Sequence, residues 1–204
     1  MEVKKLSKGI LHLIPTPIGN SSPFQVIPIS VKKEVSSLTN FIVESERSAR
    51  RFIKKIIPNK NQDELNIFLL NKFTTKRDLE SYLDPCLNGL SMGLLSDAGC
   101  PGIADPGALI VSKAHESGII VKPHVGPSSI ILALMSSGMN GQNFSFNGYL
   151  SIEKKQRLKD LKKFEQISIN RNQTQIFIET PYRNDSFFFD ALKALKNKTR
   201  FCIA

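Results

Sequence analysis

Short apolar runs alternate along most of the chain with stretches in which apolar residues recur every three or four positions. Runs of strand length are predicted at residues 10–15, 41–43, 90–95, 119–122, 144–146, 174–179 and 200–204. Strands that alternate with helices are typical of α/β proteins, in which the strands are mostly parallel. The pattern therefore predicts an α/β fold with a largely parallel sheet.

The first helical stretch has one apolar face and one basic face. Its apolar residues fall at i, i+3, i+4 and i+7, and Ser45 precedes them as a predicted N-cap. The apolar residues are Ala49, Phe52, Ile53 and Ile56, and the cations off that stripe are Arg47, Arg50, Arg51, Lys54 and Lys55. The spacing predicts a helix that packs on one side and faces solvent on the other.

A second helical stretch, residues 152–165, carries an even denser set of cations. Leu158, Leu161 and Phe164 recur at three-residue spacing and predict its packed face. The cations assigned to the remaining faces are Lys154, Lys155, Arg157, Lys159, Lys162 and Lys163. Two such patches, in a chain of 204 residues with a net charge of +10, favour a polyanionic partner such as nucleic acid. Solvated helix faces remain the alternative.

Composition narrows the class of protein. The chain is 41% hydrophobic and 23% charged, which is typical of a globular protein and excludes a disordered or collagen-like chain. The sequence has no apolar run long enough to cross a membrane and no secretion signal, so a cytoplasmic protein is expected. The three cysteines and the three histidines, His12, His115 and His124, lie far apart in sequence, so no metal site is expected.

The segment Gly126-Pro127-Ser128 follows one predicted strand and precedes a predicted helix at residues 128–137. Gly-Pro pairs mark turns between elements. We therefore predict a domain boundary near Pro123, which gives an N-terminal α/β domain at residues 1–123 and a C-terminal α/β domain at residues 124–204.

The most unusual segment is the Gly- and Pro-rich loop LLSDAGCPGIADPG, residues 94–107. Glycine permits positive φ and close approach, whereas proline fixes the chain direction, so the loop suits a ligand that lies against the main chain. Asp105 and Pro106 are predicted to open a helix whose free N–H groups can accept a carboxylate or phosphate. The dinucleotide fingerprint and the P-loop motif are both absent from the sequence.

Two further strand-to-loop junctions, residues 11–20 and 124–129, have a similar character. Loops beyond the carboxyl ends of parallel strands line the ligand crevice of an open sheet, so these junctions and the loop at 94–107 are expected to converge. A fourth segment ends a predicted strand at Glu179 and then presents Tyr182 and Arg183. From local sequence alone, a surface carboxylate is the favoured interpretation of Glu179.

The segments TPIGN, SDAGCPGIADPG, GPSS, FNGYL and ETPYR occur in the order found in the tetrapyrrole methylase superfamily, and the chain resembles that superfamily over essentially its whole length. It is most similar to the branch of S-adenosylmethionine-dependent small-subunit rRNA ribose 2′-O-methyltransferases. The resemblance implies two α/β domains with S-adenosylmethionine in the cleft between them. It also implies a homodimer and an rRNA or small-ribosomal-subunit substrate that is methylated at a cytidine.

The resemblance also assigns site residues. Near the cofactor it places Ile18, Gly19, Ser96, Asp97, Ala98, Gly99, Ile103, Ser128, Ser129, Gly148 and Ile178. Glu179 matches a position near the cofactor or substrate and is the predicted general base for a ribose hydroxyl. RNA phosphates are assigned to cations of the two basic stretches, namely Arg47, Arg50, Arg51, Lys54, Lys55, Lys154, Lys155 and Arg157.

The sequence departs from that branch at several positions. Residues 43–47 read Val-Glu-Ser-Glu-Arg where the branch has Ala-Glu-Asp-Thr-Arg, and residues 70–74 keep no histidine of its Tyr-His-Glu-His-Asn segment. Ala204 precedes the Arg-Glu-Leu-Thr-Lys segment that normally follows, so the C-terminal domain is expected to be incomplete. A tetrapyrrole or corrin methyltransferase and a non-catalytic RNA- or ligand-binding relic remain alternative functions.

Overall fold

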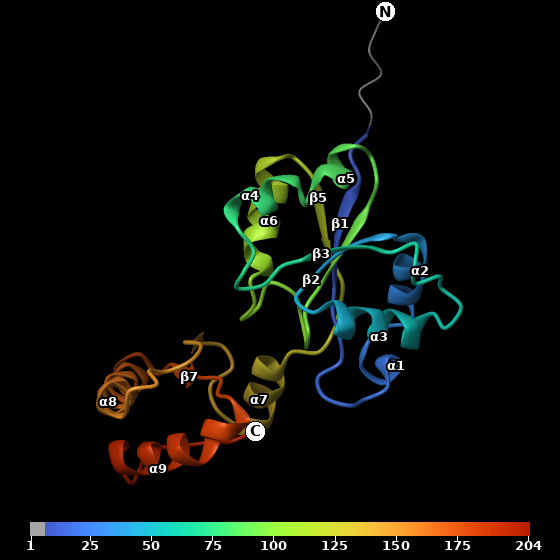
Figure 1. Ribbon diagram of the computed structural model, residues 1–204. Coiled ribbons are helices and arrows are strands. Elements are labelled where there is room, and N and C mark those ends of the chain that lie inside the picture. Colours follow the sequence, from blue (N-terminus) through green and yellow to red (C-terminus); the bar gives the residue numbers. More distant parts are fainter. Residues whose placement is uncertain (1–6) are drawn as a thin grey trace, which may run out of the picture. The chain divides into compact units, whose positions relative to one another are not determined.

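The computed structural model describes residues 7–204, which divide into two units, unit 1 up to Ser128 and unit 2 at Ser129–Ala204 (Figure 1). The division lies a few residues after the predicted boundary at Pro123. Strand β5 (Ile120–Pro123) does end there, but the residues that follow it return to unit 1, where the backbone of Gly126 lies against Pro15. The Gly-Pro turn is therefore part of unit 1.

Unit 1 is built on a five-stranded parallel sheet. The strand order is β3 (Asn66–Leu69), β2 (Asn40–Val43), β4 (Met92–Leu95), β1 (Ile10–Ile14) and β5. Neighbouring strands run parallel throughout, and Leu11 of β1 lies opposite both Met92 and Val121. The predicted α/β fold with a parallel sheet is therefore confirmed.

Helices cover both faces of this sheet (Figure 1). α2 (Ser30–Ser37) and α3 (Glu46–Ile56) pack on one face, and the short α1 (Pro23–Val26) lies beside α3. α4 (Lys76–Ser81), α5 (Asp84–Leu87) and α6 (Gly107–Glu116) pack on the other face. Successive side chains of a strand point to opposite faces, so Phe41 enters the first core and Ile42 the second.

Helix α3 has the amphipathic structure predicted for it. Its buried residues are Ala49, Phe52, Ile53 and Ile56. Ser45 is the N-cap, and its hydroxyl accepts a hydrogen bond from the Ser48 amide at 3.3 Å. The predicted packed face and the predicted cap are both confirmed, and the basic residues are left on the outer side of the helix.

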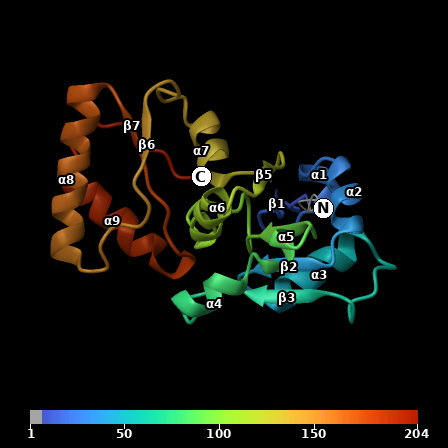
Figure 2. The ribbon, with the colours of Figure 1, turned by 90° about the horizontal axis from the view of Figure 1, so that it is seen from above.

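Unit 2 contains a two-stranded parallel sheet of β6 (Phe144–Phe146) and β7 (Thr174–Ile176). α8 (Lys154–Arg171) and α9 (Asn184–Ala194) pack against each other on one side of it, and α7 (Ser129–Ser137) lies on the other (Figure 2). A single 3₁₀ turn at Pro181–Arg183 leads into α9. Across the described part of both units, no helix combines the length and the apolarity needed to span a membrane.

The strand prediction is wrong at two places. Residues 200–204 form no strand, because β7 pairs with β6 alone and nothing in the described chain supplies residues 200–204 with a partner. Conversely, β3 is absent from the predicted strands. It is a four-residue edge strand, Asn-Ile-Phe-Leu, that follows a polar loop. Its apolar run is present in the sequence but short, and a short apolar run does not distinguish a strand from part of a helix.

Candidate functional site

The loops that follow β1 and β4 are joined at the carboxyl edge of the unit 1 sheet. Thr16 and Gly99 exchange two backbone hydrogen bonds, with N···O distances of 2.9 and 3.1 Å. Ser96 is buried and donates through Oγ to the Gly99 carbonyl at 2.9 Å, while the Thr16 hydroxyl donates to the Ser96 carbonyl at 3.1 Å. These bonds fix the two loops relative to each other.

The loop that follows β5 joins the same cluster through tight backbone contacts. A Cβ atom on Gly126 would lie 2.2 Å from Cβ of Pro15, so only glycine fits there. The thiol of Cys100 donates to the Pro127 carbonyl at 3.3 Å, and a Cβ atom on Gly99 would lie 3.3 Å from that same carbonyl oxygen. The predicted convergence of the three strand-to-loop junctions is confirmed.

Asp105 closes the second half of the Gly- and Pro-rich loop at residues 94–107, the central loop. Its carboxylate accepts hydrogen bonds from the Gly102 amide, at 2.8 Å, and from the Gly107 amide at the start of α6, at 2.7 Å. Burial raises the pKa of Asp105, and these two backbone hydrogen bonds oppose that shift. The predicted anion site at this helix terminus is therefore wrong, because the carboxylate of Asp105 already occupies it.

Two more carboxylates lie close to this loop. Glu44, which follows β2, accepts a hydrogen bond from the Asp97 amide at 3.0 Å. Burial raises the pKa of Glu44, and the nearby charges of Asp105 and Asp97 raise it further. Burial raises the pKa of Asp97 as well. An edge that gathers three acidic groups favours a ligand with positive charge over an anionic one.

The remaining predicted cofactor residues of unit 1 lie on or beside these loops. Gly19 is exposed and has a φ of +72°, a conformation that glycine adopts without strain. Ala98 and Ile103 are exposed, and Ile18 and Ser128 are half-buried. The structure therefore gathers the unit 1 residues at one edge and leaves several of them accessible to a ligand.

The predicted site residues of unit 2 lie beside its small sheet. The Ile178 amide donates to the Gly148 carbonyl at 3.1 Å, which continues the pairing of β6 with β7 beyond the strands themselves. Gly148 has a φ of +65° and turns the chain away at that point. Ser129 is exposed at the start of α7.

Glu179 is held firmly by its neighbours. Its side chain is 8% exposed, and Oε2 lies 2.7 Å from Nη2 of Arg183. Oε1 accepts a hydrogen bond from the Thr180 amide at 2.8 Å. The expectation of a surface carboxylate from local sequence is wrong, because Arg183 one helical turn later folds back onto Glu179 and covers it.

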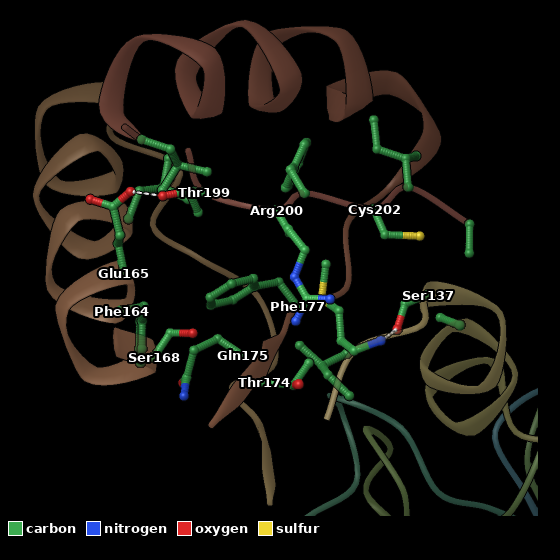
Figure 3. Close-up of a pocket in the computed structure, with 18 of the residues that line it drawn as sticks. Ser137, Phe164, Glu165, Ser168, Thr174, Gln175, Phe177, Thr199, Arg200 and Cys202 are labelled. Atoms are coloured by element: carbon green, nitrogen blue, oxygen red, sulfur yellow. Dashed lines mark hydrogen bonds between the residues drawn. The ribbon is translucent and has the colours of Figure 1, made fainter. Parts of the chain in front are cut away.

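Unit 2 also contains a cavity of about 810 Å³. α7, α8, β7, α9 and residues 199–204 line it, and Ser129, Ile178 and Glu179 are among its lining residues. Figure 3 shows Arg200 extending into the cavity beside Phe177, and Glu165 facing Thr199. The cavity thus brings three predicted site residues to one lining that is both aromatic and polar.

The basic patch on α3, defined as Arg47, Arg50, Arg51, Lys54 and Lys55, is largely accessible. Four of the five side chains are exposed. Arg50 differs from the others, because its Nε lies 2.8 Å from Oε1 of Glu46 and its Nη1 donates to the Gln62 carbonyl. The α3 patch therefore offers the four exposed cations, rather than all five, to a polyanion.

On α8, Arg157 does not belong to the solvent-exposed basic face that was predicted. It is only 5% exposed, with Nη2 2.6 Å from Oδ2 of Asp190 on α9. Arg157, Leu161 and Glu165 lie at four-residue steps on the buried side of α8. Two of the three are charged, so no apolar spacing in the sequence marks Arg157 as buried. The predicted cations that remain exposed near the start and middle of this helix, the α8 patch, are Lys154, Lys155, Lys159, Lys162 and Lys163.

The fold is that of a known methyltransferase. The structure resembles the crystal structure of the methyltransferase CobJ with a TM-score of 0.59 at 12% sequence identity, covering 92% of this chain and 77% of that one. No protein-family model matches the chain.

Curated relatives carry a more specific name. The chain is 32% identical over 195 residues to the Ribosomal RNA small subunit methyltransferase I of Vibrio cholerae, covering 96% of this chain and 64% of that protein. The proteins of the same name from Halalkalibacterium halodurans and Bacillus subtilis are each 31% identical, with 94% and 88% of this chain and 62% and 57% of theirs covered. The chain spans less than two thirds of these relatives. The similarities confirm the family resemblance carried by the motifs.

Proposed function

We propose that the chain is an S-adenosylmethionine-dependent methyltransferase that acts on a cytidine ribose 2′-hydroxyl of small-subunit rRNA. The observation that carries the proposal is the joining of three strand-end loops in unit 1 through the Thr16–Gly99 bridge and the Gly126–Pro15 contact. These are the loops whose motifs resemble the methyltransferase family. The names of the curated relatives support both the reaction and the rRNA substrate.

The residues of unit 1 fit the proposed cofactor. S-adenosylmethionine carries a sulfonium and an ammonium charge, and the loop edge gathers the carboxylates of Glu44, Asp97 and Asp105. Gly99 keeps the main chain free of side-chain bulk at the point where the loops cross. The proposed binding set in unit 1 is Ile18, Gly19, Ser96, Asp97, Ala98, Gly99, Ile103 and Ser128. Ser129, Gly148 and Ile178 of unit 2 join it on the family resemblance.

Positioning is the main contribution of this chain's residues to the reaction. S-adenosylmethionine supplies a methyl group that its sulfonium already activates. The Ser96–Gly99 and Thr16–Ser96 hydrogen bonds make the loop rigid, so it can hold a bound donor in a single orientation. A fixed orientation of donor and acceptor lowers the barrier because little entropy is then lost at the transition state.

We propose Glu179 as the group that accepts the proton of the ribose hydroxyl, with Arg183 orienting it at 2.7 Å. Glu179→Gln keeps the size of the side chain and the hydrogen bond from the Thr180 amide. We expect this variant to lower kcat by about 100-fold or more. Its affinity for S-adenosylmethionine should stay within about twofold, as measured by calorimetry alongside single-turnover methyl transfer.

The control for Glu179 is Asp185→Asn. Asp185 is an exposed acidic residue near the start of α9 that lines the same cavity but lies outside the ion pair. We expect Asp185→Asn to transfer methyl at the unmodified rate. A Glu179→Gln variant with both an unchanged kcat and unchanged cofactor affinity would restrict Glu179 to anchoring the turn at residues 179–183.

We propose that the α3 and α8 patches bind RNA phosphates. We expect charge reversal of the four exposed cations of the α3 patch to weaken binding to small ribosomal subunits. The logarithmic dependence of the affinity on salt should become shallower by about 0.7–0.9 for each phosphate contact removed. Filter binding at several salt concentrations measures both effects, and the same reversal at Lys155, Lys159, Lys162 and Lys163 tests the α8 patch.

Charge reversal of Lys32 and Lys33 is the control for non-specific electrostatics, because these exposed lysines lie on α2 outside both patches. We expect the Lys32 and Lys33 variant to keep the salt slope of the unmodified chain. An equal loss of slope in that control would mean that net charge, and not the two patches, governs RNA binding.

A further inference from the structure

Two histidines that are far apart in sequence lie next to each other in unit 1. His12 is in β1 and His124 follows β5, and Nδ1 of His12 lies 3.0 Å from Nε2 of His124. Strand pairing explains the contact, because β1 and β5 run parallel and the His124 amide donates to the Leu13 carbonyl. The expectation of no metal site rested on the separation of the histidines in sequence, and strand pairing brings two of them together in space.

A carboxylate from α2 completes the group. Oε2 of Glu34 lies 3.7 Å from Nδ1 of His12, and one ligand atom from each of the three residues lies within 4.8 Å of the others. Around a tetrahedral zinc ion, with bonds of about 2.0–2.2 Å, neighbouring ligand atoms are about 3.4 Å apart. The observed distances, 3.0 and 3.7 Å, lie on either side of that value. The two facing imidazole nitrogens are hydrogen-bonded to each other, so a bound ion would replace that hydrogen bond and the rings would rotate toward the ion.

The surroundings of these three side chains also suit the binding of a metal ion. His12 is 4% exposed, whereas His124 and Glu34 are half-buried, so the group is partly shielded but reachable from solvent. Lys122 donates to Oε1 of Glu34 at 2.8 Å and leaves Oε2 facing the histidines. Burial lowers the pKa of both imidazoles, which favours the uncharged form that a metal ion needs.

We propose that His12, Glu34 and His124 bind a divalent transition-metal ion such as Zn²⁺, with water at the fourth position. Imidazole and carboxylate are ligands that zinc accepts, and two histidines with one carboxylate are a known zinc ligand set. The ion would connect α2 to β1 and to the residue that follows the edge strand β5. None of the three residues is in the proposed sets of cofactor-binding or RNA-binding residues, so the metal can be tested separately from methyl transfer.

The test is calorimetric titration of ZnCl₂ into the full chain after treatment with a chelator, together with thermal unfolding. We expect one ion per chain and a higher Tm in the presence of zinc. Removal of a ligand should cost more than a lost supporting contact, so His124→Ala should weaken binding more than about 100-fold. Glu34→Gln, at a half-buried position that tolerates the change, should weaken it at least about 10-fold.

His115→Ala is the matched control, because His115 is the third histidine, is exposed on α6 and lies outside the group. We expect it to bind zinc as the unmodified chain does. The proposal is overturned if the folded unmodified chain binds no zinc. It is also overturned if His124→Ala and Glu34→Gln bind zinc as tightly as the unmodified chain, since the ion would then lie elsewhere.

Discussion

Replacing Gly99 by valine is expected to weaken the binding of S-adenosylmethionine by at least about 100-fold, or about 2.7 kcal/mol. Gly99 has a φ of +78°, where a β-branched residue is strained. Its Cβ would lie 3.3 Å from the Pro127 carbonyl, and the two γ-methyl groups need further space. The loops would separate at the Thr16–Gly99 bridge, and calorimetric titration of the cofactor measures the loss.

Gly138→Val separates this effect from simple backbone strain. Gly138 has a φ of +64°, close to that of Gly99, but a Cβ atom there meets nothing within 4 Å. The two variants therefore carry a similar backbone penalty, and only Gly99→Val adds a steric conflict at the loops. We expect Gly138→Val to bind the cofactor normally. A folded Gly99→Val variant with unimpaired binding would exclude the central loop from the cofactor site.

Asp190→Ala is expected to destabilise the protein by about 3–5 kcal/mol, because it leaves the buried guanidinium of Arg157 without its carboxylate. Asp190 is 3% exposed and accepts from Nε and Nη2 of Arg157 at 3.0 and 2.6 Å. Arg157 also donates to the carbonyls of Ser151 and Ile152, so the pair ties α8 to α9 and to the turn before α8. Urea denaturation measures the free energy of unfolding.

Glu46→Ala is the control for this pair. Glu46 lies 2.8 Å from Arg50, but both side chains are substantially exposed, so the loss should stay below about 1 kcal/mol. Replacing both Arg157 and Asp190 by apolar residues should recover most of the stability lost in Asp190→Ala, since no buried charge then remains unpaired. An Asp190→Ala cost no larger than that of Glu46→Ala would contradict a structural role for the buried pair.

The same ion pair makes stability dependent on pH. Burial pushes the pKa of Asp190 upward, but the hydrogen bond and charge of Arg157, with a contribution from Lys154, outweigh it, so the pKa lies below its ordinary value. The stabilisation is therefore fully present above pH 4–5 and is lost as the pH falls through the lowered pKa. Unfolding midpoints between pH 3 and pH 7 should fall less steeply in Asp190→Asn than in the unmodified chain.

Much of the fold could be predicted from local sequence. The core strands β1, β2 and β4 are nearly continuous apolar runs because both faces of each are buried, and such runs are conspicuous in a sequence. The face of α3 that carries Phe52 and Ile53 was equally predictable, because a helix repeats its buried positions every three to four residues. The edge elements were not predicted correctly. The apolar run of β3 is short and ambiguous, and residues 200–204 have no strand to pair with in the described part of the chain.

The candidate site was predictable only in part. The glycines and prolines of residues 94–107 marked the central loop, and the rule that parallel strands end at one edge predicted its approach to Thr16. The hydrogen bond from the Asp97 amide to Glu44 was not predictable, because it depends on β2 lying next to β4 in the sheet. The partners of Glu179 were missed as well, since the side-chain rotamer of Arg183 determines the ion pair.

The sequence by itself determined the α/β class, the parallel core, the amphipathic α3 helix and the family resemblance, because each depends on residue types at short, regular spacings. The tertiary structure alone decided which charged groups became partners. It buried Arg157 against Asp190 and brought His12, Glu34 and His124 together from separate parts of the chain. Such pairings depend on strand order and helix docking, which bring residues together regardless of their separation in the sequence.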